Sequence, residues 1–193
     1  MLIYPPAEDS YFLSDILKNE IPELLKKNPD LTFLEIGAGS GIHLQTVLNL
    51  GVKKQNIFSS DMNIESVQHC NLLGFNCIKS DLFENINGNF DFIVFNPPYL
   101  PEDKYDKEKD TTGGKKGSEI INRFLKQAKA YIKKNGKIFL LTSSLAKDIN
   151  FADYEKKLLG KEKLFFEELS VWELGLINYK LITFPSDERC AVS

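Results

Sequence analysis

The feature that most constrains the fold is a short apolar run that ends in three closely spaced glycines. Residues 31–36, Leu-Thr-Phe-Leu-Glu-Ile, are followed by glycine at positions 37, 39 and 41. An apolar run of this length, closed by glycines, predicts a strand that is buried on both faces of a sheet. The glycines predict a tight turn into a helix, because a residue without a Cβ readily adopts positive φ. The sequence therefore predicts a buried strand, a turn and a helix over 31–50.

Apolar strands and amphipathic helices alternate along the rest of the chain, which predicts an α/β fold with a mainly parallel sheet and helices on both faces. Only a few residues around Gly175 join the last two strands, so that pair must be antiparallel. A helix is expected over 8–19, and Pro22 is expected to open a second short helix that ends near residue 28. Further helices are expected near 41–50, 63–73, 118–134 and 147–159, and further strands near 56–60, 75–79, 90–95, 136–143, 164–172 and 177–184.

Length and charge restrict the class of protein. A chain of 193 residues fits a single domain over 1–193, and a net charge of −3 weighs against nucleic acid as the partner. No apolar run is long enough to cross a membrane and the first residues do not form a secretory signal, so we expect a cytoplasmic protein. The cysteines are scattered without a CxxC pair, which indicates free thiols and no metal site: Cys70, Cys77 and Cys190.

The glycine turn is a candidate ligand site, because Gly37 and Gly39 let a ligand approach the backbone closely. Its GxGxG spacing differs from the GxGxxG fingerprint of dinucleotide sites, which argues against a bound pyrophosphate. Taken alone, the motif is also compatible with a plain turn from strand to helix.

Acidic residues follow the next two strands. Asp61 lies at a strand end, where its carboxylate can accept both hydroxyls of a ribose. The alternative is that Asp61 caps the helix that begins near Asn63. Asp81, one strand later, can accept a hydrogen bond from an exocyclic amine such as that of adenine, and Leu82 and Phe83 are candidates for the walls around the ring. Together with the glycine turn, these strand ends predict a site for one nucleoside.

The sequence Asn96-Pro97-Pro98-Tyr99 closes the strand expected near 90–95. Prolines fix the backbone after Asn96, so its side-chain oxygen and the Pro97 carbonyl are two fixed acceptors for the N–H groups of a planar nitrogen. Such a nitrogen is a poor nucleophile. The two acceptors would direct its lone pair at the sulfonium methyl of S-adenosylmethionine and stabilise the charge that develops. Pro98 and Tyr99 are the further substrate contacts, with Tyr99 stacked on the planar group. The alternative is a proline-rich strand end without chemistry.

Residues 102–110, directly after this motif, are almost all charged. Mixed charge is typical of a solvated loop. Because a loop at this place lies above the strand ends where open α/β sheets bind ligands, we also consider it as a lid over the substrate.

Several of these motifs resemble a known enzyme family. The motif at 96–99, with Glu35 and the glycine turn upstream, resembles the amino-methyltransferases that act on adenine, guanine or protein glutamine. Residues 4–13 and the Gly-Gly-x-x-Gly at 113–117 are similar to the HemK-like release-factor glutamine methyltransferases, in their short eukaryotic and archaeal branch. The resemblance implies the class I methyltransferase fold, a Rossmann-like seven-stranded sheet whose last strand is antiparallel. It also implies N5-methylation of the glutamine in the Gly-Gly-Gln motif of a class I release factor.

The resemblance implies roles for individual residues as well. Residues 1–30 would form a helical segment that caps the cofactor site, with Ser10 in contact with S-adenosylmethionine. Asn96 would hold the glutamine amide and also contact the cofactor. Further cofactor contacts are implied at Glu35, Gly37, Gly39, Asp61, Asp81 and Leu82.

Enzymes of the short branch work with a small zinc-binding activator protein that docks along the edge strand of the sheet. Here that edge would be the third strand, 75–79, with Phe75 and Ile78 available for the contact. The helical N-terminal domain of the bacterial enzymes has no counterpart in this sequence. The segment after Trp172 matches the family poorly, and residues 186–193 are interpreted as a disordered tail.

Two other functions stay open at this point. An amino-methyltransferase acting on adenine or guanine would use the same chemistry at Asn96, and the lack of a net basic charge is what weighs against it. A non-enzymatic nucleoside-binding module would not need the intact motif at 96–99.

Overall fold

The computed structural model describes residue 3, residues 5–100 and residues 114–177. The predicted strand 177–184, the charged loop 102–110, Cys190 and the tail 186–193 lie outside these residues, apart from residue 177. Within the described part, the elements in chain order are α1 (Glu8–Lys27), β1 (Phe33–Ile36), α2 (Ile42–Asn49), the 3-10 turn η1 (Lys54–Asn56), β2 (Ile57–Asp61), α3 (Ile64–Leu72), β3 (Asn76–Lys79), β4 (Phe90–Phe95), α4 (Glu119–Ala128), β5 (Ile132–Ser143), β6 (Tyr154–Lys163) and β7 (Glu168–Leu176).

The strands form one sheet in the order β3-β2-β1-β4-β5-β7-β6. The five strands from β3 to β5 are parallel, and β7 runs antiparallel between β5 and β6. This confirms the mostly parallel seven-stranded sheet with an antiparallel last strand. The chain crosses from one side of β1 to the other between β3 and β4, so β1 and β4 form the switch point at which open α/β sheets bind ligands.

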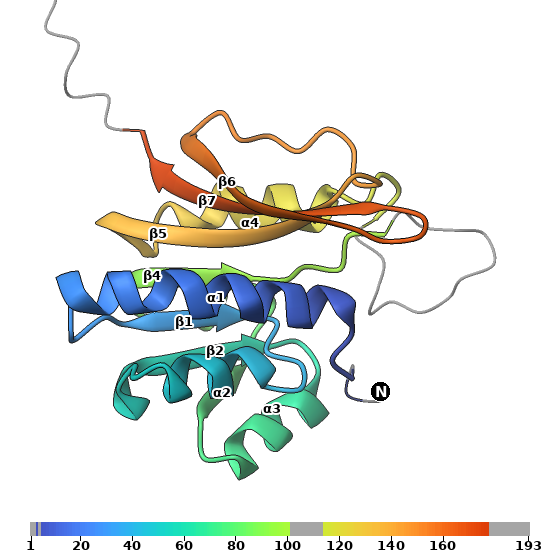
Figure 1. Ribbon diagram of the computed structural model, residues 1–193. Helices are drawn as coiled ribbons and strands as arrows, with labels where there is room; N and C mark the ends of the chain where they lie inside the picture. The colour runs from blue at the N-terminus through green and yellow to red at the C-terminus, as the bar shows by residue number, and fades with distance from the viewer. Residues whose placement is uncertain (1–2, 4, 101–113, 178–193) are drawn as a thin grey trace, which may run out of the picture.

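Side chains alternate between the two faces of the sheet, which gives the molecule two cores. Phe33 and Phe92, with ring centroids 5.8 Å apart, pack into a core shared with α1, α2 and α3. Leu34 and Ile93 point to the opposite face and pack with α4. Figure 1 shows α1 in front of the sheet and α4 behind it. The expectation of helices on both faces is confirmed.

The helix predicted near 147–159 is wrong, because residues 147–153 form no helix and residues 154–159 belong to strand β6. Only one side of β6 is paired, and its charged residues face solvent at the edge of the sheet. A Cβ at Gly160 would lie 2.9 Å from the terminal methyl of Ile16 in α1, so a larger residue there would require the Ile16 side chain to move. The antiparallel pair is therefore β6 and β7, and Gly175 lies inside β7 rather than in a turn.

Two helix boundaries also differ from the prediction. The N-terminal segment is one helix that continues through Pro22, because Leu13, Leu17 and Ile21 form a fully buried stripe along it. Packing of that stripe outweighs the hydrogen bond that the proline cannot donate. Helix α4 ends at Ala128, and β5 begins at Ile132.

The third strand of the chain, β3, is an edge strand as predicted. Phe75, just before it, is buried with Lys54 over its ring, so the prediction that this side chain is available for a partner is wrong. Ile78 is half-buried. None of the described helices is both long and apolar enough to span a bilayer.

Candidate active site

A cavity of about 270 Å³ opens at the carboxyl ends of β1, β2 and β4. It lies at the switch point of the sheet, where parallel strands bring their ends together. With the exception of Phe83, the site residues predicted from the sequence line this cavity: Ser10, Glu35, Gly37, Gly39, Asp61, Asp81, Leu82, Asn96, Pro97, Pro98 and Tyr99.

The glycine turn forms one wall of the cavity. Gly37, Gly39 and Gly41 have φ angles of +71°, +51° and +75°, which L side chains rarely adopt. The backbone N–H of Gly37 donates to the Ser60 carbonyl at the end of β2, with a distance of 2.8 Å. A Cβ at Gly39 would meet no atom within 4 Å, so the turn leaves open space at this position.

Asp61 braces the glycine turn. Its Oδ2 accepts from the Gly39 N–H and its Oδ1 from the Asn63 N–H, both at 2.8 Å. The residue that caps α3 is Asn63, whose side chain accepts from the Glu65 N–H, so the alternative role of Asp61 as helix cap is wrong. Asp61 instead holds the turn at the mouth of the cavity.

The cavity wall formed by the residues after β3 differs from the prediction at one residue, Phe83. Asp81 and Leu82 line the cavity, and Asp81 Oδ2 accepts from Arg123 Nη2 at 2.9 Å. Phe83 does not line it, because its ring stacks on Tyr131 in the core with centroids 4.6 Å apart.

A buried pair of ionisable groups lies beneath the cavity. His43 Nδ1 is 2.6 Å from Glu35 Oε1, and His43 Nε2 is 3.0 Å from the Ser10 carbonyl oxygen. A carbonyl only accepts, so Nε2 carries a proton, and a second proton must lie between Nδ1 and the carboxylate. The other Glu35 oxygen, Oε2, is buried and has no partner among the described residues.

Both members of this pair hold protons more tightly than usual. Burial raises the pKa of the Glu35 carboxyl, although the charge and hydrogen bond of His43 partly offset this. Burial lowers the pKa of His43, but the Glu35 carboxylate and the hydrogen bonds to Glu35 and Ser10 outweigh burial, so the His43 pKa is raised. Burial of the Glu35 carboxyl and the interaction of its charge with the imidazolium explain the two directions.

Asn96 has a fixed orientation at the end of β4. Its Nδ2 donates to Asp9 Oδ2 at 2.9 Å, and Asp9 Oδ1 accepts from the Ser10 N–H at 2.7 Å. The opposite atom of the Asn96 amide, Oδ1, is buried and has no hydrogen-bond partner in the described part of the chain. A buried acceptor without a partner is uncommon in a native protein and indicates a ligand contact.

The family model for the methyltransferase small domain matches residues 14–150. The chain belongs to this family. It is an S-adenosylmethionine-dependent methyltransferase, and its fold is that of the class I methyltransferases.

Relatives and solved structures agree with this assignment. The methyltransferase is 36% identical over 192 residues to a Methanocaldococcus jannaschii protein named as a protein N5-glutamine methyltransferase, covering 89% of this chain and 92% of that one. It is 29% identical over 155 residues to Methyltransferase HEMK2 of Mus musculus, covering 72% and 71%. It is similar in fold to the E. cuniculi Mtq2–Trm112 complex, responsible for methylation of the eRF1 termination factor. That match has a TM-score of 0.70 and 24% identity, and covers 92% of this chain and 100% of the other.

Two residues of the methyltransferase site were missed by the sequence reasoning. The sequence analysis assigned no function to Asp9 or His43. Both residues are buried and line the cavity. The sequence contains a signal for each of them, which is a polar residue on the buried face of a helix. Asp9 is one helical turn from Leu13 on the buried stripe of α1, and His43 is one turn from Val47 on the buried side of α2. A polar residue on an apolar stripe needs a partner, and that requirement points to a site.

Proposed function

We propose that the methyltransferase transfers a methyl group to the side-chain amide nitrogen of the glutamine in the Gly-Gly-Gln motif of a class I release factor. The observation that carries this proposal is the Asn96 amide, whose nitrogen is held by Asp9 while its buried oxygen lacks a partner. A primary amide has two N–H groups to donate, and this oxygen would take one of them.

The chain's own residues fit S-adenosylmethionine at the remaining part of the cavity. The unpaired Glu35 Oε2 suits an ammonium group, and the open space at Gly39 suits a ligand close to the backbone. Asp61 would hold the ribose, and Asp81 with Leu82 would hold the adenine. The first turn of α1, with Ser10 in the cavity wall, would cap the cofactor.

The chain's own contribution to the reaction is to align the amide nitrogen with the methyl group. S-adenosylmethionine supplies an electrophilic methyl group on a sulfonium sulfur. Asn96 Oδ1 and the Pro97 carbonyl would accept the two amide N–H groups, which orients the nitrogen lone pair and stabilises its positive charge as the bond forms. Pro98 and Tyr99 would contact the planar amide on its faces. As the nitrogen–methyl bond forms, the methyl–sulfur bond would break and leave a neutral thioether, and the nitrogen would release one proton to water.

The names of the relatives support glutamine over a nucleobase. The Methanocaldococcus jannaschii relative carries N5-glutamine methylation in its name, and further relatives are named release factor glutamine methyltransferase or eRF1 methyltransferase catalytic subunit. The matched structures whose titles name RNA methyltransferases are below 25% identical and share only the fold.

Methyl transfer to an isolated release factor tests this function. Labelled cofactor should place one methyl group on the factor, and replacing the glutamine of its Gly-Gly-Gln motif should abolish the signal. Label that persists on the substituted factor, or that survives protease treatment of a tRNA or DNA substrate, would overturn the proposal.

We also propose that a small zinc-binding activator protein docks along β3. The E. cuniculi structure contains Mtq2 with Trm112, which supports a small partner. β3 is an edge strand of the described sheet, and the Asn71 side chain covers part of that edge through hydrogen bonds with the Cys77 N–H and carbonyl. Beside the edge lies a hollow of about 200 Å³ whose lining includes Phe58, Ile78 and Phe90. A partner could contact this edge over Asn71 and place an apolar side chain in the hollow beside Ile78.

Co-purification of the activator with the methyltransferase tests this second proposal. Ile78→Lys should reduce recovery of the activator with the chain, because a charge would enter the apolar hollow. Leu158→Lys is the matched control, since Leu158 is 40% exposed on β6 at the opposite edge. Equal recovery of the activator with both variants would argue against docking at β3.

A further inference from the structure

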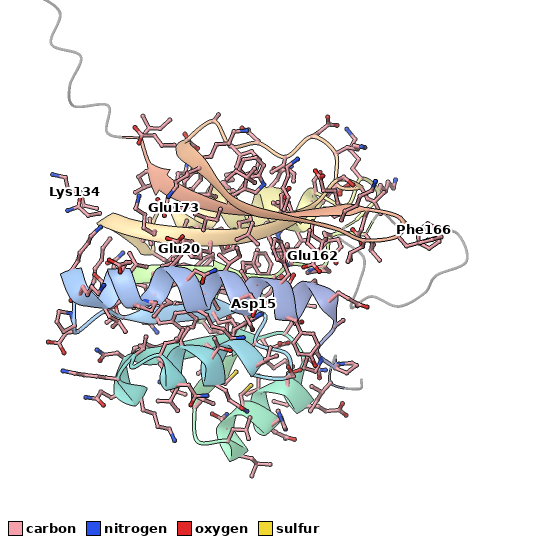
Figure 2. The ribbon with its side chains drawn as sticks, in the orientation of Figure 1. Asp15, Glu20, Lys134, Glu162, Phe166 and Glu173 are labelled. Carbon is pink, nitrogen blue, oxygen red and sulfur yellow. The ribbon has the colours of Figure 1, made fainter. Side chains whose placement is uncertain are left out.

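The turn between β6 and β7 carries two exposed aromatic side chains that the site does not use. Phe165 and Phe166 are 92% and 84% exposed, and their rings contact each other edge to face with centroids 4.7 Å apart. Figure 2 shows Phe166 at the tip of this hairpin, pointing away from the body of the molecule. Large aromatic residues exposed together commonly mark a contact surface.

The tip lies at the same end of the sheet as the cavity. Phe95, just before Asn96, pairs with Leu140 of β5, and Ser143 at the end of β5 pairs with Leu169 at the start of β7. Strand spacing and rise place the tip on the order of 20 Å from Asn96. Figure 1 shows the turn at the end where α1 begins and where the chain leaves β4. A protein bound over the cavity would span this distance within one ordinary interface.

The hairpin tip is held in place by hydrogen bonds. The Leu164 N–H donates to the Glu167 carbonyl at 2.8 Å and closes the turn. The Ser143 hydroxyl donates to the Glu167 carboxylate, and the Glu168 N–H donates to the Ser144 hydroxyl at 3.0 Å. The two rings are thus presented by a fixed turn, which lowers the entropy lost when a partner binds them.

From these observations we infer that Phe165 and Phe166 form a docking point for the protein substrate, a release factor with an apolar pocket beside its Gly-Gly-Gln loop. This inference rests on the proposed function. Two phenylalanines exposed to this degree offer roughly 300–400 Å² of mostly apolar surface, which is a large part of the roughly 800 Å² that one partner buries in a standard interface. A second copy of the chain on this tip would stand beside the mouth of the cavity and obstruct a macromolecular substrate.

Measuring KM and kcat with the whole release factor as substrate tests the inference. The enzyme is assayed as isolated, together with any partner protein that stays bound to it. The double variant Phe165→Ser, Phe166→Ser should raise KM for the factor roughly 10- to 100-fold, as expected for the loss of aromatic contacts at an interface centre. Its kcat and its Kd for S-adenosylmethionine should stay within about twofold of the wild type, because neither residue lines the cavity.

Leu72→Ser provides the matched control. Leu72 is 87% exposed at the end of α3, far along the chain from the hairpin, and its loss should leave KM unchanged. An unchanged KM in the double variant would overturn the docking role while leaving the proposed function intact. A shift from dimer to monomer at unchanged KM would assign the tip to contacts between copies. Absence of methyl transfer by the wild type would overturn the proposed function and the docking role together.

Discussion

Asp9 and Asn96 are 87 positions apart in the sequence, and their side chains meet with Oδ2 and Nδ2 2.9 Å apart. Asp9 lies on the first turn of α1, whereas Asn96 follows β4. The hydrogen bond fixes which end of the Asn96 amide faces the cavity, because a carboxylate accepts only from the nitrogen. The Asn96 acceptor that we propose for the substrate is therefore oriented by a residue from another element.

Removal of Asp9 tests this relationship. Asp9→Ala should lower kcat roughly 10- to 100-fold, since a hydrogen bond to a charged group contributes about 1.5–3 kcal/mol and a factor of ten corresponds to about 1.4 kcal/mol. Asp15→Ala is the control on the same helix, because Asp15 is exposed and pairs with Lys18. Similar kcat values for both variants would show that Asp9 does not position Asn96.

Asn96→Ala removes the proposed acceptor itself. We expect kcat to fall at least about 100-fold, as for the loss of one preorganised group that stabilises developing charge. The Kd for S-adenosylmethionine should change much less, because most of the proposed cofactor contacts come from other strand ends. Calorimetric titration of the cofactor and single-turnover rates measure the two effects separately. A variant that retains the wild-type kcat would exclude Asn96 as the residue that activates the amide.

Gly39→Ala tests the open space in the glycine turn. The φ angle of +51° makes any L residue strained, at about 1–2 kcal/mol, while a Cβ meets no protein atom within 4 Å. Gly88→Ala is matched to it, with a φ of +94° and equally open surroundings outside the cavity lining. Both variants should lose a few degrees of Tm, but only Gly39→Ala should weaken cofactor binding, by tenfold or more. Equal cofactor affinity in the two variants would place the cofactor away from this turn.

The Glu35–His43 pair predicts a dependence of stability on pH. Both pKa values are raised in the folded protein, so the folded state binds protons more tightly than the unfolded state. The stability that the pair contributes is full below the unfolded values and is lost as pH rises through the folded ones. For His43 this loss begins above its ordinary value of 6.5.

Urea denaturation without cofactor at several pH values from 6 to 9 measures this loss. The free energy of unfolding of the wild type should decrease over this range relative to Glu35→Gln, His43→Gln, which has no titratable group at either position. A wild type that gains stability relative to this double variant as pH rises would contradict the assignment of the shared proton.

Some features of the fold were predictable from local sequence, and others were not. Continuous apolar runs predict the buried strands, and closely spaced glycines predict the turn, because its positions need positive φ. Strand β6 was mistaken for a helix because its residues are mainly charged and leave no apolar alternation to detect. Its conformation depends on pairing with β7 and on the close approach of α1 at Gly160.

The same division applies to the site. Many of the residues that line the cavity are predictable from the sequence, because parallel strands place their carboxyl ends at one edge and the motifs directly follow such ends. The places of Asp9 and His43 in the lining, and the orientation of the side chains, follow from the tertiary structure. Asp9 reaches Asn96, and His43 joins Glu35 to the Ser10 carbonyl, through contacts between α1, α2 and the sheet. Such contacts depend on how helices pack across the sheet, and spacing along the chain does not specify that.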